Sequence, residues 1–150
     1  METQSQWVHL APMQSLWDGF VGMIDLLGWE GGSVCGALGS LSKVTLTRVC
    51  QDTNGTIQFA SAASYERALE IVSLAGTFGR DKSERGWDLH LHGVMVDCEG
   101  HLLAGHLLPT ECKVLITLEA ILLHPTHLHL TRESRPVGLV FVEREQGFGQ

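Results

Sequence analysis

The sequence predicts an α+β domain in which one main amphipathic helix packs against a mixed, mostly antiparallel sheet of seven to eight strands. Three observations lead to this prediction. The chain has 150 residues, 44% of them hydrophobic, which suits one domain with its own core. Only one stretch has helical periodicity, whereas many apolar runs are bounded by turn signals. No linker interrupts the chain, so we expect a single domain over residues 1–150 with its core at about 7–143.

The helix is predicted within "PMQSLWDGFVGMIDLLGW". Leu16, Phe20, Met23 and Leu27 follow one another at helical spacing and would form one apolar face. We expect the helix to begin near Pro12 and to end near Gly28.

Strand signals fill most of the remaining chain. "GGSVCGALGS" and "KVTLTRV" predict two strands joined at Leu41-Ser42, and an Asn-Gly turn before Ile57 predicts a hairpin. "ALEIVSLAGTFG" indicates a central strand, although residues 65–69 could instead begin a helical turn. "KVLITLEAILL" fits a strand that is buried on both faces. The other expected strands cover residues 7–10, 128–134 and 137–143.

Half of the eight histidines lie in "WDLHLHGVMVDCEGHLLAGHLLP", which predicts a β-hairpin. A three-residue loop between Asp97 and His101, with Gly100 in the left-handed conformation, would place His92 directly opposite His106. His90 precedes His92 by two residues and shares its face. Opposed Cβ atoms lie about 5 Å apart, so the three imidazoles would converge.

Three histidines without a fourth protein ligand are typical of an open metal site. The sequence therefore predicts that His90, His92 and His106 bind a divalent metal, with zinc as the first choice and nickel, iron or copper as alternatives. Such a metal could activate a water molecule against a small-molecule substrate. The alternative is that these are ordinary exposed or hydrogen-bonded imidazoles. A slip of one residue in the hairpin would separate them.

Glu119 and a second group of histidines are further candidates. Glu119 interrupts an apolar run, where an acid is costly unless it is paired. It could orient a metal-bound histidine, bind the metal itself, act as a base, or form an ion pair with an arginine at the strand end. His127 and His129 form another His-x-His, with His124 nearby, but no partner histidine lies in register, so a metal site there is disfavoured.

Charge, cysteine spacing and the N-terminus exclude other classes. The net charge is −7 and the ten basic residues do not cluster, which argues against direct binding of nucleic acid. The four cysteines form no C-x-x-C pair, which argues against a zinc ribbon. We recognise neither a signal sequence nor a membrane span, and we expect a cytoplasmic protein.

The segments "GALGSLSKVTL", "LEIVSLAGTFG", "LHLHGVMVDCEGHLLAGHL" and "ITLEAIL" together resemble the plants-and-prokaryotes-conserved (PPC) domain family. The resemblance runs in order from the Trp7 region to Val142. Members have a Glu-Ile-Leu-Ser-Leu-Ser-Gly strand, here residues 70–76, and prokaryotic members follow it with His-x-His, here His90 and His92. A Gly-x-x-x-Gly-Gly-His-Leu strand follows, here residues 100–107, in which Ala104 replaces the first glycine of the pair.

The resemblance implies a seven- or eight-stranded domain that assembles as a homotrimer. It also implies that His90, His92 and His106 form the metal site of prokaryotic members, with Glu119 at the position of the family's glutamate. Plant members carry an AT-hook that enters the DNA minor groove, and this chain shows no such segment.

Three functions are therefore open. The first is a metal-binding homotrimer that acts on a small molecule, with whether it is an enzyme left undecided. The second is a DNA-associated or transcription-regulatory module, which rests on analogy with plant members. The third is a non-catalytic oligomeric scaffold.

Overall fold

The computed structural model describes residues 2–83, 86–136 and 138–144. They form a mostly-β domain with an eight-stranded mixed sheet and one α-helix, as predicted. In chain order the elements are β1 (Thr3–Leu10), α1 (Leu16–Leu27), β2 (Gly31–Thr47), β3 (Val49–Gln51), β4 (Ile57–Phe59), β5 (Ala63–Arg80), β6 (Trp87–Val96), β7 (Leu102–Leu107), the 3-10 turn η1 (Pro109–Glu111), β8 (Lys113–Pro125), β9 (Leu130–Arg135) and β10 (Gly138–Glu143).

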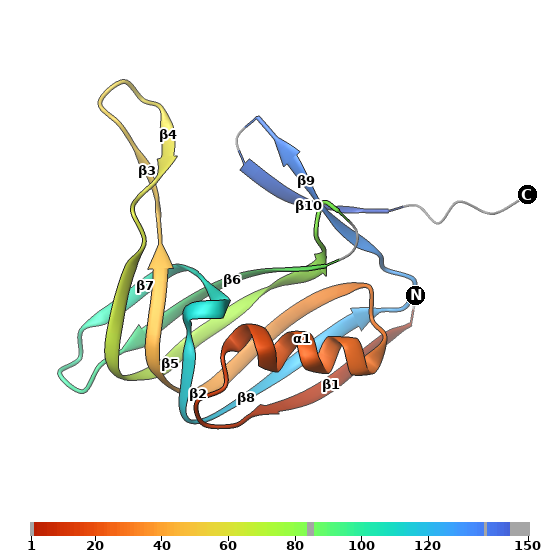
Figure 1. The fold of residues 1–150 in the computed structure, drawn as a ribbon, viewed down its shortest axis with the longest axis horizontal. Coiled ribbons are helices and arrows are strands. Elements are labelled where there is room, and N and C mark those ends of the chain that lie inside the picture. Colours follow the sequence, from red (N-terminus) through yellow and green to blue (C-terminus); the bar gives the residue numbers. More distant parts are fainter. Residues whose placement is uncertain (1, 84–85, 137, 145–150) are drawn as a thin grey trace, which may run out of the picture.

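Helix α1 lies across one face of the sheet over β1, β8 and β2 (Figure 1). Its apolar face is completely buried at Leu16, Phe20 and Ile24. The helix begins later than the expected Pro12, because the Ser15 side chain caps it by accepting the Asp18 N–H at 3.0 Å. It ends as predicted at Gly28, whose φ of 67° provides the left-handed cap.

The strands follow the order β1-β8-β2-β7-β6-β5-β9-β10, with an additional pairing between β2 and β5. Strand β2 pairs with β5 on one edge and with β8 and β7 on the other, while β6 joins β5 to β7. Strands β2, β5, β6 and β7 therefore close into a ring of pairings. A single parallel bridge, between Arg80 of β5 and Thr131 of β9, makes the sheet mixed.

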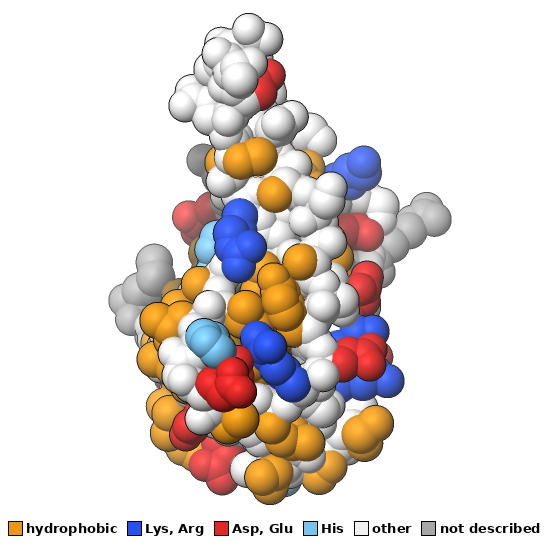
Figure 2. Space-filling model, turned by 90° about the vertical axis from the view of Figure 1, so that its left-hand side faces the viewer, with side chains coloured by type: hydrophobic (Ala, Val, Ile, Leu, Met, Phe, Trp, Pro, Cys, Tyr) orange, Lys and Arg blue, Asp and Glu red, His pale blue; other side chains and the backbone are white. Residues whose placement is uncertain are grey.

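Two hairpins rise from this body. The β3–β4 hairpin, which the Asn-Gly turn predicted, forms a separate two-stranded sheet and protrudes furthest (Figures 1 and 2). The β9–β10 hairpin rises on the other side of the molecule (Figure 1). The strand expected over 137–143 is present as β10, and residue 137 lies outside the described residues.

The structure corrects two sequence expectations and decides between the two alternatives left open for residues 65–69. The two strands expected on either side of Leu41-Ser42 are one strand, because an irregularity between Leu41 and Lys43 shifts the register without ending the pairing with β5. Residues 65–69 are extended within β5 and not helical. Strand β8 is not buried on both faces: its burial alternates, because α1 covers only one face of the sheet.

None of the helices in the described part of the chain is long and apolar enough to span a membrane.

Candidate metal centre

The β6–β7 hairpin has the register that the sequence predicts. His92 lies directly opposite His106, and Gly93 lies opposite Gly105. The loop closes through a hydrogen bond from the Asp97 N–H to the His101 carbonyl, and Gly100 has a φ of 87°. Leucines on the opposite face of both strands anchor the hairpin in the core; they are Leu89, Leu91, Leu103 and Leu107.

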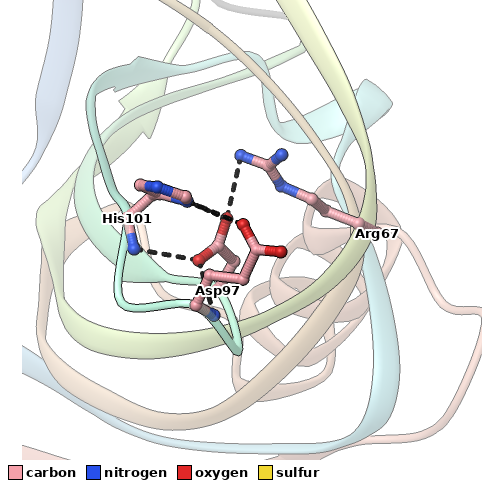
Figure 3. Close-up of polar contacts among 4 residues, drawn as sticks. Arg67, Asp97 and His101 are labelled. Atoms are coloured by element: carbon pink, nitrogen blue, oxygen red, sulfur yellow. Dashed lines mark hydrogen bonds and ion pairs between the residues drawn. The ribbon is translucent and has the colours of Figure 1, made fainter.

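A polar clasp holds the hairpin loop in this register (Figure 3). The buried Asp97 carboxylate accepts the backbone N–H groups of Glu99 at 3.0 Å and His101 at 2.9 Å. Its other oxygen lies 3.2 Å from both Arg67 and the His101 ring. The backbone hydrogen bond from His101 is the main cause that holds the pKa of Asp97 below its usual value. Because Asp97 begins the loop and its carboxylate binds His101 at the other end, a shift of register would cost these contacts.

His90, His92 and His106 converge at the base of the hairpin. One ligand nitrogen from each lies within 4.8 Å of the others. The ring centroids are 5.0 Å apart for His90 and His92, 4.9 Å for His90 and His106, and 5.3 Å for His92 and His106. This is the gathering of imidazoles that the register predicts.

Arg132 of β9, a buried residue, completes the cluster. Its Nη2 lies 2.8 Å from Nδ1 of His90, and its Nε lies 3.2 Å from the Asp88 carboxylate, an ionic contact without hydrogen-bond alignment. The guanidinium also lies 4.4 Å from the centroid of the Phe141 ring. A guanidinium only donates hydrogen bonds, so Nδ1 of His90 must accept.

This contact fixes the tautomer of His90. Since Nδ1 accepts, the neutral ring carries its proton on Nε2, which lies 2.9 Å from Nε2 of His92 and donates to it. A metal ion could take Nε2 of His90 only if this proton moved to Nδ1, and a protonated Nδ1 could no longer accept from Arg132. His90 is therefore the ligand that costs most to recruit.

Burial favours the neutral form of two of the three rings. Desolvation lowers the pKa of His90 to about 4, and the positive charge of Arg132 adds to the effect. Burial also lowers the pKa of His106, followed by the influence of His92 and Arg132. Neutral imidazoles are the form that binds metal. A donor set of three imidazoles fits a borderline divalent ion such as zinc.

The cluster faces a cavity of about 900 Å³ between the two protruding hairpins. Apolar and positively charged side chains line it, and no Asp or Glu is among the described lining residues. These are Thr47, Arg48, Val49, Phe59, His90, His92, Ala104, Gly105, His106, Leu108, Arg132, Gly138 and Leu139. A bound ion would thus have open positions toward a space that can hold a small molecule.

Glu119 does not lie at this cluster. It is exposed on β8, opposite Leu38 of β2, and lines a second cavity of about 400 Å³. Strand β2 separates β8 from β7, and β2 and β5 separate it from β6, so Glu119 lies at least two strands away from each of the three histidines. The expectation that this carboxylate is buried is wrong, because its face of β8 has no covering layer.

The other histidines do not gather. Nδ1 of the buried His124 donates to the Gly31 carbonyl at 2.6 Å, and the ring stacks on Trp29 at 5.1 Å. His127 is exposed in a turn with a φ of 72°, and His129 precedes β9. Among the described residues, the only group of three or more potential ligands is His90, His92 and His106.

Sequence reasoning missed Arg48 and Arg132. Arg132 comes shortly after the second His-x-His, on a strand whose place in the sheet no local pattern reveals. The strand itself reads as polar, LTRESR, so nothing in it marked Arg132 as a buried residue.

The fold and the cluster define a class of protein: a single mostly-β domain whose ring of strands presents three histidines to a cavity. Residues 8–124 match the Plants and Prokaryotes Conserved (PCC) domain. Because this match covers well over half of the chain, the protein belongs to that family, which is the one its sequence resembles.

Solved structures share the fold. A hypothetical protein from Salmonella cholerae-suis is 24% identical with a TM-score of 0.75, and the alignment covers 96% of both chains. A plant- and prokaryote-conserved protein from Pyrococcus horikoshii is 16% identical with a TM-score of 0.75, over 95% of this chain and 93% of the other. The protein AF0104 from Archaeoglobus fulgidus, described as metal-containing, is 16% identical with a TM-score of 0.76, over 95% and 94%.

A curated relative, the bifunctional protein GlmU from a Synechococcus strain, is 30% identical over 107 residues. The match covers 71% of this chain but only 15% of the relative. The chain therefore corresponds to a small part of that protein.

Proposed function

We propose that this protein is a homotrimer that binds a divalent metal ion, with zinc as the first choice, and receives a small molecule in the adjoining cavity. His90, His92 and His106 would hold the ion. The observation that carries the proposal is the convergence of three imidazoles on the wall of a cavity with no acidic lining residue among those described. The description of the Archaeoglobus protein as metal-containing supports it.

A bound divalent ion would supply Lewis acidity to a molecule in the cavity. The protein's own residues set the conditions for this chemistry. The β6–β7 register positions the rings and burial keeps His90 neutral, while the contact of Arg132 with Nδ1 would have to break for Nε2 of His90 to bind the ion. The arrangement suits a binding protein as well as a hydrolase or lyase, and turnover is a separate question from metal binding.

The face of the sheet opposite α1 supports self-association. Trp7 and Ile121 face each other across β1 and β8, and Leu38 and Val72 adjoin them around the second cavity. These four side chains are between 41% and 67% exposed. Such an apolar surface is typical of a protein–protein contact. Three copies is the number that the family resemblance implies. A role for Glu119 at the histidines would require this face to meet a site on another chain.

The surface gives little support to the DNA-associated alternative. In the view of Figure 2, Lys and Arg side chains are separated by acidic, polar and apolar surface and form no continuous basic patch among the described residues. Several arginines are also paired with carboxylates, including Arg67 with Asp97 and Arg80 with Glu30. Phosphate binding needs clustered basic side chains.

Elemental analysis of untagged protein tests the proposal. We expect about one metal ion per chain, and we expect His92→Ala to weaken zinc binding at least about a hundredfold. His92 is exposed, so its truncation should leave the fold intact. His127→Ala, which removes an exposed histidine from the turn after β8, is the matched control and should retain the metal.

Light scattering of the same samples should report three chains for the wild type and for both variants. A wild-type protein that takes up no zinc after dialysis against the ion would overturn the metal proposal. An intact trimer in that sample would leave the scaffold function in its place.

A further inference from the structure

The charge of the histidine cavity is opposite to that of the chain. The protein carries 17 acidic and 10 basic residues. The described residues that line the cavity nevertheless include two arginines and three histidines and no acid. A cavity with this lining favours a negatively charged occupant, because a carboxylate or phosphate there would meet positive charge without acidic repulsion.

Arg48 is the cavity residue whose guanidinium can donate hydrogen bonds to a ligand. It is exposed at the base of the β3–β4 hairpin, and its Nε donates to the Ala104 carbonyl at 2.8 Å, which fixes the guanidinium beside the strand of His106. Within the described residues no carboxylate forms an ion pair with it. Its two terminal nitrogens can therefore donate to a ligand as a fork.

Arg132 contributes charge to the cavity but has fewer hydrogen-bond donors available for a ligand than Arg48. The contacts with Asp88 and His90 hold it, and Asp88 offsets part of its charge. It adds positive potential beside His90 on β6, whereas Arg48 is held at Ala104 on β7. The cavity thus has one arginine at each of the two histidine strands.

Apolar side chains complete the cavity. Val49 and Phe59 from the β3–β4 hairpin are 65% and 62% exposed, and Leu139 from β10 is 47% exposed. The two hairpins stand on either side of the histidine strands (Figure 1). A ligand with an apolar body would bury these surfaces, and about 900 Å³ is enough for a molecule of drug size.

We propose that the cavity binds a small organic oxyanion, a carboxylate or phosphate on an apolar body, with Arg48 as its main charged contact. This inference names the ligand class for the cavity of the proposed function. It does not require a bound metal, since Arg48 and the apolar walls belong to the protein itself.

Matched acids and neutral analogues test the proposal by ligand-observed NMR and titration calorimetry. The carboxylate pairs are benzoate with benzamide and hexanoate with hexanamide, and the phosphate pair is phenyl phosphate with phenol. Each is measured with metal-free protein, prepared by dialysis against a chelator, and again with zinc-loaded protein. We expect at least one acid to bind metal-free protein about tenfold or more tightly than its neutral analogue.

Two arginine variants assign the contact. Arg48→Met should reduce the affinity of the acid to that of its neutral analogue. Arg135→Met removes the same charge from an exposed arginine that does not line the cavity, and it should change nothing. Arg48→Lys should restore part of the affinity, which also shows that the Met variant did not simply misfold.

Three outcomes would overturn the inference: no acid binds, acids and neutral analogues bind equally, or acids bind only zinc-loaded protein regardless of Arg48. In the last case the oxyanion would be a ligand of the metal alone. The zinc measurement stands apart from this one. Acid binding without zinc uptake would refute the metal site only, and zinc uptake without acid binding would refute the oxyanion site only.

Discussion

The two His-x-His segments of this chain have the same local pattern and opposite structural outcomes. His90 and His92 lie in the middle of β6, paired with β5 on one side and β7 on the other. His127 lies in the turn after β8 with a φ of 72°, His129 lies in the short segment before β9, and neither residue belongs to a strand. Only the first segment has a third histidine directly across a strand pair.

This difference shows that cross-strand register, and not the tripeptide, makes the cluster. A His-x-His on a strand places two rings on one face, which is too few ligands for a stable site. The β6–β7 hairpin adds the third through the pairing of His92 with His106. The histidine nearest to the second segment, His124, is buried in the core, where it donates to the Gly31 carbonyl and stacks on Trp29. Three perturbations test this contrast.

The largest effect is expected from His124→Ala. The side chain is 8% exposed, donates to the Gly31 carbonyl and stacks on Trp29. Its loss should lower the free energy of unfolding by about 2–4 kcal/mol, because it leaves both a cavity and an unpaired buried carbonyl. Urea denaturation measures this change, and the metal content should equal that of the wild type. Loss of metal with unchanged stability would place His124 in a metal site and end the contrast.

Gly105→Ala tests the register of the first segment. A Cβ at Gly105 would lie 2.5 Å from the Thr47 carbonyl oxygen, so β7 must move away from β2 and take His106 with it. We expect a loss of about 1–3 kcal/mol in unfolding free energy together with weaker zinc binding. Gly22→Ala is the control, because a Cβ there meets nothing within 4 Å and should stabilise α1 by about 0.5–1 kcal/mol. Wild-type zinc affinity in Gly105→Ala would show that the histidines do not depend on this register.

The hairpin could be predicted from sequence because its determinants are local. Gly100 and the Asp97–His101 pair set a three-residue loop, and period-two alternation then places every later residue. The buried leucines and the facing histidines both followed from that loop. The fold class followed in the same way, from one helical stretch among many strand signals.

What could not be predicted depends on contacts between distant elements. Arg132 meets His90 across 42 residues, and no local pattern indicates that β9 lies beside the end of β5. An apolar sequence such as that of β8 occurs both in strands covered on one face and in strands covered on both. The exposure of Glu119 and Ile121 therefore could not be predicted from the sequence. The irregularity between Leu41 and Lys43 in β2 looks in the sequence like a turn between two strands, because a bulge and a turn use similar residues.

The smallest effect is expected from His127→Gly. A non-glycine residue at a φ of 72° is strained by about 1–2 kcal/mol, and glycine removes that strain at an entropic cost of about 0.4–1 kcal/mol in the unfolded chain. The net result should be a gain of up to about 1 kcal/mol in unfolding free energy with unchanged metal content. The same substitution in an extended strand, His9→Gly in β1, should instead destabilise by about 0.5–1 kcal/mol. If the two substitutions change the unfolding free energy with opposite signs, the gain at His127 comes from its left-handed backbone conformation and not from loss of an exposed histidine side chain. A loss of stability or of metal in His127→Gly would instead reveal a role for the side chain that its exposed position in the turn does not suggest.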